Sequence, residues 1–477
     1  MTTTATAFSS SETEVLTRSV EVDDEIEQTP KALVPEKYDL QKCVDWIQKR
    51  QVERVCLQFP DRLLPDAFDV AMYLEEKLGR KVYVLGDTSY GSCCIDEITA
   101  EHIGANAIIH FGHACLNPTV RLPIYHVLPK NEIDSEAFCK EFEQYFHQDP
   151  TRALLFFYDV SFAHSIETIY ETLKPKFKNL ILTRLNCISN VEYTDVKDDA
   201  STAVLGRSYV LENGCQTQEY EMFFLGPSGK TLSNLAMTIP AKSWYYSDGG
   251  GIKKFEAVNT PWLKRRRFLV EKLKDAKVVA IVVATLGIKN YLSIIKTLKS
   301  TLKKVNKKTY MLSVGKINPA KLANFPEMDV FVVISCPESE IFDSRDFLKP
   351  LLLPFEVDLA FNSSREFSQN YCMDFSQILP GGASYVDFKA STEPDVSLIS
   401  GDLRGSKEDA PLVTEMNALA CKADGTVAIG KAGARFLHER SWKGLEQKLG
   451  QSEIKPAEKG RKGTSLGYEN EPICKET

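Results

Sequence analysis

Short apolar runs alternate with helical patterns along the first part of the chain. Three runs are apolar over the length of a strand: residues 54–59 (RVCLQF), 81–86 (KVYVLG) and 105–111 (ANAIIHF). Between them, apolar side chains recur at helical spacing in residues 63–78 and 96–104. Strands that are apolar along nearly their whole length and alternate with helices are typical of a parallel sheet covered on both faces. The pattern therefore predicts an α/β fold.

The same order of elements recurs late in the chain, where three apolar runs are separated by two helical patterns. These segments are residues 277–284, 288–303, 308–313, 317–324 and 329–334. A cysteine follows the third run in both copies, Cys115 in the first and Cys336 in the last. Nearly equal lengths of chain separate the first run from this cysteine in the two copies, which indicates an internal repeat.

A third, looser copy lies between these two and carries a long insertion around residues 185–220. Its segments are residues 152–157, 163–173, 179–182 and 222–225. Its last run is followed by Gly226 rather than by a cysteine. The chain is therefore predicted to form three tandem, homologous α/β domains, each built on a parallel sheet.

Domain boundaries follow from these copies and from the composition of the two ends. We expect domains at residues 31–148, 149–262 and 263–400. Residues 1–30 contain few large apolar side chains and are predicted to be disordered. Residues 401–477 are rich in Gly, Lys and Glu, and they are predicted to form a mostly flexible tail with one helix at residues 434–449.

Four cysteines lie in loops that follow predicted strands. Cys93 and Cys94 follow the second run of the first copy, Cys115 its third, and Cys336 the third run of the last copy. Loops at the carboxyl ends of parallel strands line one crevice, so these thiols could meet there. Thiolates suit iron–sulfur clusters, zinc or copper(I), although each cysteine could also be a small buried hydrophobe. Adjacent Cys93 and Cys94 can hardly both bind one metal ion, so one of them could be a bystander.

Other motifs are weaker. His113 with nearby cysteines could bind zinc, but no CxxC pair is present. Residues 226–231 (GPSGKT) resemble the end of a phosphate-binding loop, but two residues rather than four separate the glycines, which favours a tight turn. Residues 249–251 (GGG) are predicted to connect the middle and last domains. Acid–base candidates such as His110 and Asp96 are better explained as a core histidine and a helix cap.

Charge and apolar length exclude two classes of partner. The 477-residue chain has a net charge of −7, which provides no electrostatic footprint for a nucleic acid. No stretch approaches the ~18 apolar residues of a membrane span, and no secretory signal pattern is found. We therefore expect a cytosolic or nuclear protein, whose 12 cysteines are thiols or metal ligands rather than disulfides.

Several motifs taken together resemble the diphthamide synthase family, and particularly its eukaryotic second-subunit branch. These motifs are QFPDRL at residues 58–63, YGSCCIDE at 90–97, HFGHACLNP at 110–118 and ISCPESEIFD at 334–343. The resemblance covers about residues 35–400. It implies three homologous α/β domains around a central 4Fe–4S cluster, held in catalytic members by one cysteine per domain. An open iron there binds S-adenosylmethionine, whose 3-amino-3-carboxypropyl group is transferred to a histidine of translation elongation factor 2.

The middle-domain cysteine of that family is absent from this sequence, where Arg207 stands in its place. The resemblance places the other two family cysteines at Cys93 or Cys94 and at Cys336. It makes Cys115 the candidate for a replacement ligand, with Cys187 and Cys215 as weaker substitutes. In the family, an iron that is open to S-adenosylmethionine requires a cage of three thiolates. The loss of the middle-domain cysteine therefore argues against catalysis by this chain on its own.

The resemblance thus implies a cytoplasmic accessory subunit that has no catalytic residues of its own. It would keep the 4Fe–4S cluster of the catalytic first subunit reduced within a heterodimer. S-adenosylmethionine would be bound by that partner, and a small metal-binding protein would donate electrons. Two alternatives stay open: the chain could itself be a catalytic S-adenosylmethionine-dependent transferase, or it could be a cluster-free or zinc-bound scaffold for the catalytic subunit.

Overall fold

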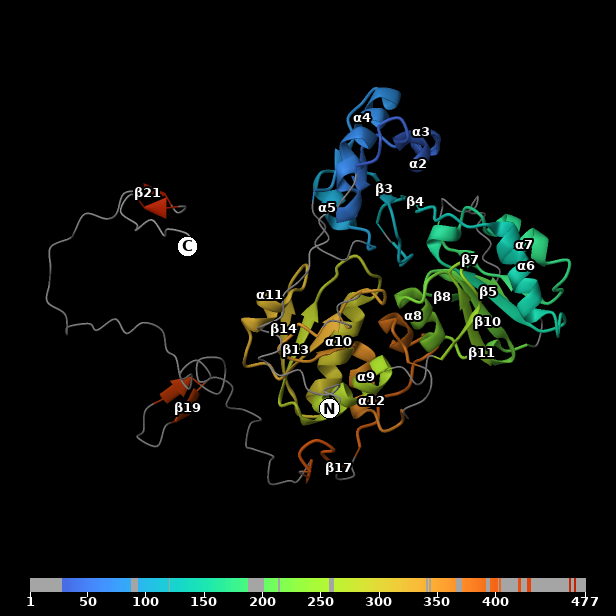
Figure 1. The fold of residues 1–477 in the computed structure, drawn as a ribbon. Helices are drawn as coiled ribbons and strands as arrows, with labels where there is room; N and C mark the ends of the chain where they lie inside the picture. The colour runs from blue at the N-terminus through green and yellow to red at the C-terminus, as the bar shows by residue number, and fades with distance from the viewer. Residues whose placement is uncertain are drawn as a thin grey trace, which may run out of the picture. The chain divides into compact units, whose positions relative to one another are not determined.

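The computed structural model divides the chain into two units, residues 1–409 and 410–477 (Figure 1). It describes residues 28–86, 93–119, 121–187, 201–212, 215–256, 261–339, 342, 345–365, 371–391, 395–401 and 403–404, and four short strands beyond residue 418. The predicted helix at residues 434–449 and most of the predicted disordered segment lie outside these residues. Thr29, within that segment, donates its backbone N–H to the Asp66 carboxylate at 2.8 Å.

The first sheet is parallel and has the strand order β2-β1-β3-β4. Its strands are β1 (Val55–Gln58), β2 (Tyr83–Val84), β3 (Ala107–Phe111) and β4 (Ile124–Val127). Its helices are α2 (Val34–Lys37), α3 (Leu40–Lys49), α4 (Ala67–Leu78) and α5 (Glu97–His102). Every residue of β1 and β3 is buried, which explains why these strands are continuous apolar runs.

The last sheet has the corresponding order β14-β13-β15-β16 and is also parallel. Its strands are β13 (Val278–Val283), β14 (Lys308–Ser313), β15 (Val330–Ile334) and β16 (Leu351–Leu352). Its helices are α9 (Pro261–Asp275), α10 (Tyr291–Lys304), α11 (Pro319–Ala323) and α12 (Pro354–Phe361).

The middle sheet has the order β12-β11-β10-β5-β6, and only β12 is antiparallel to its neighbour. Its strands are β5 (Leu154–Tyr158), β6 (Leu180–Leu182), β10 (Glu221–Leu225), β11 (Ser243–Ser247) and β12 (Lys253–Phe255). Its helices are α6 (Ser135–Phe146), α7 (Ile166–Leu173) and α8 (Lys230–Thr238). The prediction for residues 249–251 was wrong, because they join β11 to β12 within this sheet.

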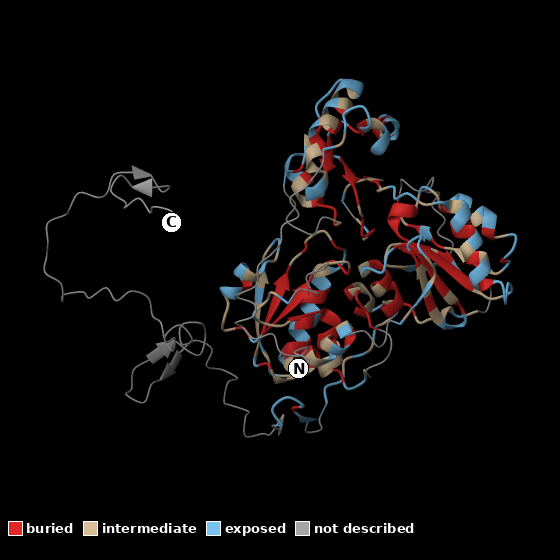
Figure 2. Cartoon of the chain, in the orientation of Figure 1, coloured by how far each residue is buried: buried red, intermediate tan, exposed pale blue. Residues whose placement is uncertain are grey.

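All three sheets therefore share one arrangement. The first strand in sequence lies between the second on one side and the third and fourth on the other. Buried strands lie among helices whose outer faces are exposed (Figure 2). The predicted α/β fold is confirmed. Within the insertion, β7 (Arg184–Leu185), β8 (Ser201–Val204) and β9 (Arg207–Val210) form a small antiparallel sheet.

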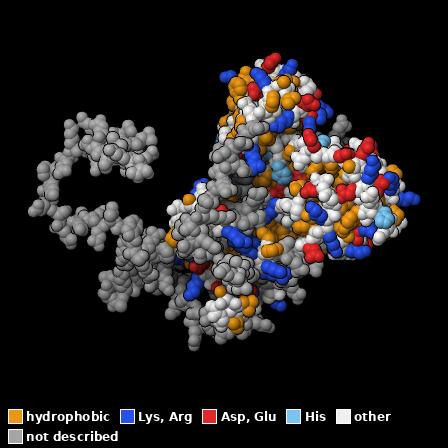
Figure 3. Space-filling view, in the orientation of Figure 1, with side chains coloured by type: hydrophobic (Ala, Val, Ile, Leu, Met, Phe, Trp, Pro, Cys, Tyr) orange, Lys and Arg blue, Asp and Glu red, His pale blue; other side chains and the backbone are white. Residues whose placement is uncertain are grey.

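Charged side chains of both signs are interspersed among the described residues on the face in Figure 3. No helix in the described parts of the chain has the length and apolar character needed to cross a membrane.

A buried ion pair joins two helices of the last sheet. Arg266 of α9 and Glu356 of α12 have side chains that are 1% and 0% exposed. The Arg266 Nε donates to Glu356 Oε1 at 2.7 Å, and Nη2 pairs with the other carboxylate oxygen. Tyr371 and the backbone N–H of Leu353 also donate to this carboxylate. Because every charge is paired and hydrogen-bonded, the cost of burying the two ions is offset.

Breaking this pair on one side should destabilise the protein strongly. We expect Glu356→Gln or Arg266→Met to lower the free energy of unfolding by ~3–5 kcal/mol, because one buried charge loses its partner. Urea unfolding followed by tryptophan fluorescence measures this, since Trp262 lies 5.7 Å from the Arg266 guanidinium. Lys176→Met, which breaks an exposed pair with Glu143, is the matched control and should change little. Equal urea midpoints for Glu356→Gln and this control would contradict the expectation.

Candidate metal centre

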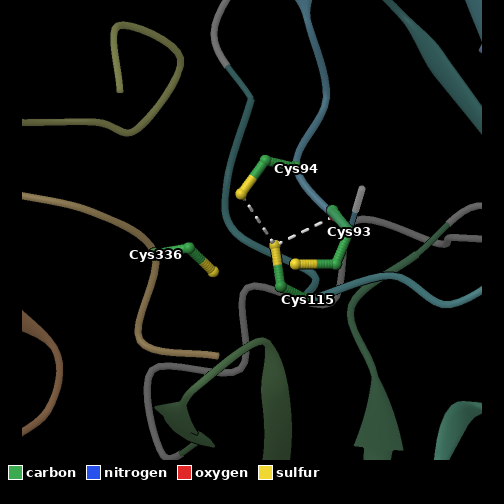
Figure 4. A group of neighbouring side chains, drawn as sticks. All are labelled: Cys93, Cys94, Cys115 and Cys336. Atoms are coloured by element: carbon green, nitrogen blue, oxygen red, sulfur yellow. Dashed lines mark hydrogen bonds between the residues drawn. The ribbon is translucent and has the colours of Figure 1, made fainter. Parts of the chain in front are cut away.

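Four cysteine side chains converge at the carboxyl ends of strands from the first and last sheets. Cys93 and Cys94 precede α5, Cys115 follows β3, and Cys336 follows β15. Their sulfur atoms all lie within 4.8 Å of one another (Figure 4). Cys93 is partly exposed and the other three are buried. The structure thus brings together all four cysteines that the sequence analysis proposed, although Cys336 is more than 200 residues away from the others in the sequence.

A buried glutamine fixes the loop that carries Cys94. Gln58, the last residue of β1, is fully buried. Its amide donates to the Cys94 carbonyl oxygen at 2.7 Å and accepts from the Asp96 backbone N–H at 3.0 Å. Asp96 in turn caps α5 by accepting from the Thr99 backbone N–H at 3.0 Å. The loop is thereby anchored both to the central strand and to the following helix.

The Cys115 loop packs directly against the Cys93 loop. Gly112, at the end of β3, has a φ of 95°, a left-handed conformation that favours glycine. The Cys115 backbone N–H donates to the Cys93 carbonyl at 3.3 Å. The Cys115 sulfur lies 3.2 Å from that same oxygen and 4.0 Å from the Cys94 sulfur.

The Cys336 loop is held by residues of both other sheets. Its Glu338 carboxylate lies 2.7 Å from His113 Nε2 and accepts a hydrogen bond from Thr231 of α8 at 3.3 Å. Asn234, also on α8, donates to the Pro337 carbonyl at 2.8 Å. Burial lowers the pKa of His113, but the hydrogen bond and charge of Glu338 outweigh this, so the pKa is raised above its usual value. The contact between His113 and Glu338 therefore joins a loop of the first sheet to the Cys336 loop.

The thiols perturb one another strongly. Hydrogen-bonding interactions with Cys336, Cys93 and Cys94 hold the pKa of Cys115 well below its usual value. The pKa values of these three thiols are raised, chiefly by their interaction with Cys115. A bound metal would supply the positive charge that lets all four thiols ionise together.

The four sulfur donors suit a thiolate-bound metal. A single tetrahedral zinc ion, with bonds of about 2.3 Å, would place the sulfur atoms ~3.8 Å apart, close to the 4.0 Å between Cys94 and Cys115. A four-iron cluster is larger, so the sulfur atoms would move apart to hold it. It also offers one iron for each sulfur, which removes the objection that adjacent Cys93 and Cys94 cannot both bind.

Other predicted candidates lie elsewhere. Cys187 and Cys215 are not part of the four-cysteine group. They pack into or against separate apolar cores of the middle unit, by which we mean the middle sheet with its helices and the small antiparallel sheet. Arg207, where the family cysteine was expected, is 1% exposed and donates to the backbone carbonyls of Leu205 and Tyr158.

Sequence reasoning did not find the polar residues that support the group. These are Gln58, Asn117, Thr231, Asn234 and Glu338. A signal was present for three of them, since Gln58, Asn117 and Glu338 stand within the motifs that carried the resemblance.

A pocket opens beside the sulfur atoms, lined by the cysteine loops of the first sheet and by residues that follow β13, including Thr285. Two of its buried polar atoms, Thr285 Oγ1 and His126 Nδ1, have no hydrogen-bond partner among the described residues. Burial lowers the pKa of His126 to about 3, so its imidazole is neutral. The pocket therefore offers uncharged polar groups to a small ligand.

Comparison with known proteins identifies relatives over nearly the whole chain. A family model described as putative diphthamide synthesis protein matches residues 59–372. Subunit 2 of 2-(3-amino-3-carboxypropyl)histidine synthase from Xenopus laevis is 37% identical and covers 98% of this chain and 99% of its own. The subunit of the same name from Danio rerio is 38% identical and covers 98% and 97%.

Solved structures share the fold at lower sequence identity. The crystal structure of Dph2 from Pyrococcus horikoshii has a TM-score of 0.54 at 20% identity, covering 70% of this chain and 92% of that one. A structure of Dph2 from the same organism with a 4Fe–4S cluster has a TM-score of 0.53 at 20% identity, covering 67% and 90%.

The role of Gln58 can be tested without any metal. We expect Gln58→Leu to destabilise the metal-free protein by ~2–4 kcal/mol, because the buried Cys94 carbonyl and Asp96 N–H both lose their partner. Chemical denaturation measures this difference. Gln41→Leu serves as the control, because it removes an exposed glutamine on α3 whose side chain, among the described residues, bonds to Asp45 alone. If both variants unfold at the same denaturant concentration, Gln58 does not anchor the loop.

Proposed function

The chain belongs to the diphthamide synthesis protein family, and we propose that it is the accessory iron–sulfur subunit of the enzyme that begins diphthamide biosynthesis. In this role it supports transfer of the 3-amino-3-carboxypropyl group of S-adenosylmethionine to a histidine of translation elongation factor 2. The observation that carries the proposal is the convergence of four cysteine sulfurs within 4.8 Å of one another.

Cys93, Cys94, Cys115 and Cys336 would hold a 4Fe–4S cluster, one iron for each thiolate. Three features support this choice of metal: four soft donors, the burial of three of them, and a solved structure of the same fold, Dph2 from Pyrococcus horikoshii, that holds a 4Fe–4S cluster. The domains at residues 31–148, 149–262 and 263–400 would surround this centre. When bound, a cluster of this type supplies one-electron transfer, with a potential set by ligand charge, hydrogen bonds and exposure.

The accessory role follows from the number of thiolates. With four cysteines in the group, each iron would have a protein ligand, and none would be open to S-adenosylmethionine. Arg207 adds no ligand, because its guanidinium is bonded to backbone carbonyls. We therefore assign the cosubstrate to a catalytic first subunit, with which this chain forms a heterodimer. The relatives from Xenopus laevis and Danio rerio are each subunit 2 of their enzyme, which supports such a partner.

In this scheme the chain's own residues hold and shield the redox centre. Gln58 and Glu338 fix the two cysteine loops, and burial of three of the four cysteines limits the access of water. Electrons would come from a small metal-binding donor protein and pass to the catalytic subunit, which keeps its cluster reduced. The complex would act in the cytoplasm, where translation elongation factor 2 is found.

One alternative has a specific observation in its favour. The short sulfur separations favour a cluster-free or zinc-bound scaffold for the catalytic subunit.

Iron content tests the cluster directly. The anaerobically purified wild-type chain should be brown and hold about four irons. We expect Cys336→Ala and Cys115→Ala to lose most of this iron, because each removes a thiolate ligand of the cluster. Cys43→Ala replaces a buried cysteine of α3 outside the group and should keep the wild-type iron content. A colourless wild-type protein with one zinc per chain would favour the scaffold.

Electron supply separates the accessory role from catalysis. In a complex with a wild-type first subunit, Cys336→Ala should slow modification of elongation factor 2 at least ~10-fold when a protein donor supplies electrons. Excess dithionite should restore the rate, because it reduces the catalytic cluster directly. The assay is incorporation of labelled 3-amino-3-carboxypropyl groups. If the isolated wild-type chain cleaved S-adenosylmethionine under dithionite, the chain would be catalytic instead.

A further inference from the structure

The amide side chain of Asn117 lies between two of the four sulfur atoms. Its Nδ2 is 3.1 Å from Cys115 Sγ and 3.2 Å from Cys336 Sγ. An amide nitrogen carries two hydrogens, so it can donate to both sulfurs at once. One of these sulfurs comes from the first sheet and the other from the last. No other amide side chain among the described residues donates to any of the four sulfurs.

We infer that Asn117 raises the reduction potential of the metal centre by N–H···S hydrogen bonding to its thiolate ligands at Cys115 and Cys336. The inference rests on the proposed function, since it concerns the cluster that these cysteines would hold. Asn117 is a positioning residue in this scheme, because it acts on the metal only through the sulfur atoms.

The backbone around Asn117 is held in place by the middle unit. The preceding residue, Leu116, has a φ of 55°, a left-handed conformation that is uncommon for leucine. Gly206, in the turn between β8 and β9, packs so closely on it that an added Cβ would lie 2.3 Å from the Leu116 Cβ and 2.7 Å from its carbonyl oxygen. The Gly206 carbonyl accepts a hydrogen bond from the Asn186 N–H at 2.9 Å. The turn is therefore itself anchored, and it fixes the approach of Asn117 to the sulfurs.

The direction of the effect follows from charge. Reduction adds one electron to a centre whose thiolate ligands are already negative. A hydrogen bond to sulfur stabilises the more negative, reduced state more than the oxidised state, so it raises the potential. Among the described residues, two backbone N–H groups also lie near these sulfurs, that of Glu338, 3.4 Å from the Cys336 sulfur, and that of Asn117 itself beside the Cys115 sulfur, but each reaches one sulfur alone. Asn117 is therefore the principal polar donor to this pair.

Potentiometry of the iron-loaded full-length chain tests the inference. Asn117→Leu, which has a similar shape but no N–H, should lower the equilibrium constant for one-electron reduction about tenfold, a downward shift of about 59 mV. Asn117→Asp replaces the donor by a carboxylate and should lower the potential further. Asn117→Gln retains the donor on a longer side chain and should recover part of the loss. The midpoints are read from an anaerobic redox titration followed by electron paramagnetic resonance, at matched iron content.

Asn234→Leu is the matched control. It removes a buried amide that donates to the Pro337 carbonyl, next to Cys336, but to none of the sulfurs. A merely structural role for Asn117 would make the two Leu variants behave alike, with altered iron content or stability and an unshifted potential. We expect the potential to fall only in the Asn117 variant. Equal potentials in Asn117→Leu, Asn234→Leu and the wild type would overturn the inference.

The wild-type chain provides a second measurement in case Asn117→Leu does not fold. Pulsed electron paramagnetic resonance of the reduced cluster, with asparagine that carries 15N only in its side-chain amide, should detect a nitrogen coupled through the hydrogen bonds of Nδ2. Absence of that coupling would refute the role of Asn117. Wild-type protein that binds no iron would instead refute the proposed function, and the two failures are therefore distinguishable.

Discussion

The candidate metal centre depends on one buried carboxylate. Glu338 follows Cys336 by two residues, and its side chain is 8% exposed. It bonds to His113 of the first sheet's loops and to Thr231 of the middle unit. A buried carboxylate is costly unless it is paired and hydrogen-bonded, so Glu338 is stabilised where the loops of the first and last sheets meet α8. The same contacts place the Cys336 sulfur next to the cysteine sulfurs in the loops of the first sheet.

The middle unit contributes support rather than ligands to this centre. Thr231 and Asn234 of α8 hold the Cys336 loop, while Gly206 packs on Leu116 next to Cys115. Arg207 buries its guanidinium beside that turn, bonded to backbone carbonyls. Arg207 stands where the family has a cysteine, so the middle unit supplies no ligand from this position. The turn at Gly206 instead packs on the loop that carries Cys115.

The fold and the grouping of cysteines could be predicted, but the residues that orient them could not. Buried strands such as β3 and β15 are continuous apolar runs, and the loops after such strands lie at one edge of a parallel sheet. That reasoning placed Cys115 and Cys336 together without any knowledge of distances. The bonds of Gln58 and Glu338 depend instead on how separate loops approach in three dimensions, and a local pattern carries no such information. The weak β2, only Tyr83–Val84, shows the same limit, since its bounds depend on pairing with β1.

The three sheets share one arrangement but contribute unequally to the metal centre. In each sheet the loop after the third strand reaches the same edge, and two of these loops carry Cys115 and Cys336. The equivalent loop of the middle sheet begins at Gly226 after β10. An added Cβ there would lie 2.6 Å from the Phe224 ring and 2.9 Å from the Asp159 Cβ. No side chain fits at Gly226 without displacing buried neighbours, and the residues that follow it in this loop, 227–230 (PSGK), include no cysteine, so this copy contributes no thiol. The fourth sulfur comes instead from a second cysteine in the first sheet's loop, where Cys93 and Cys94 stand side by side.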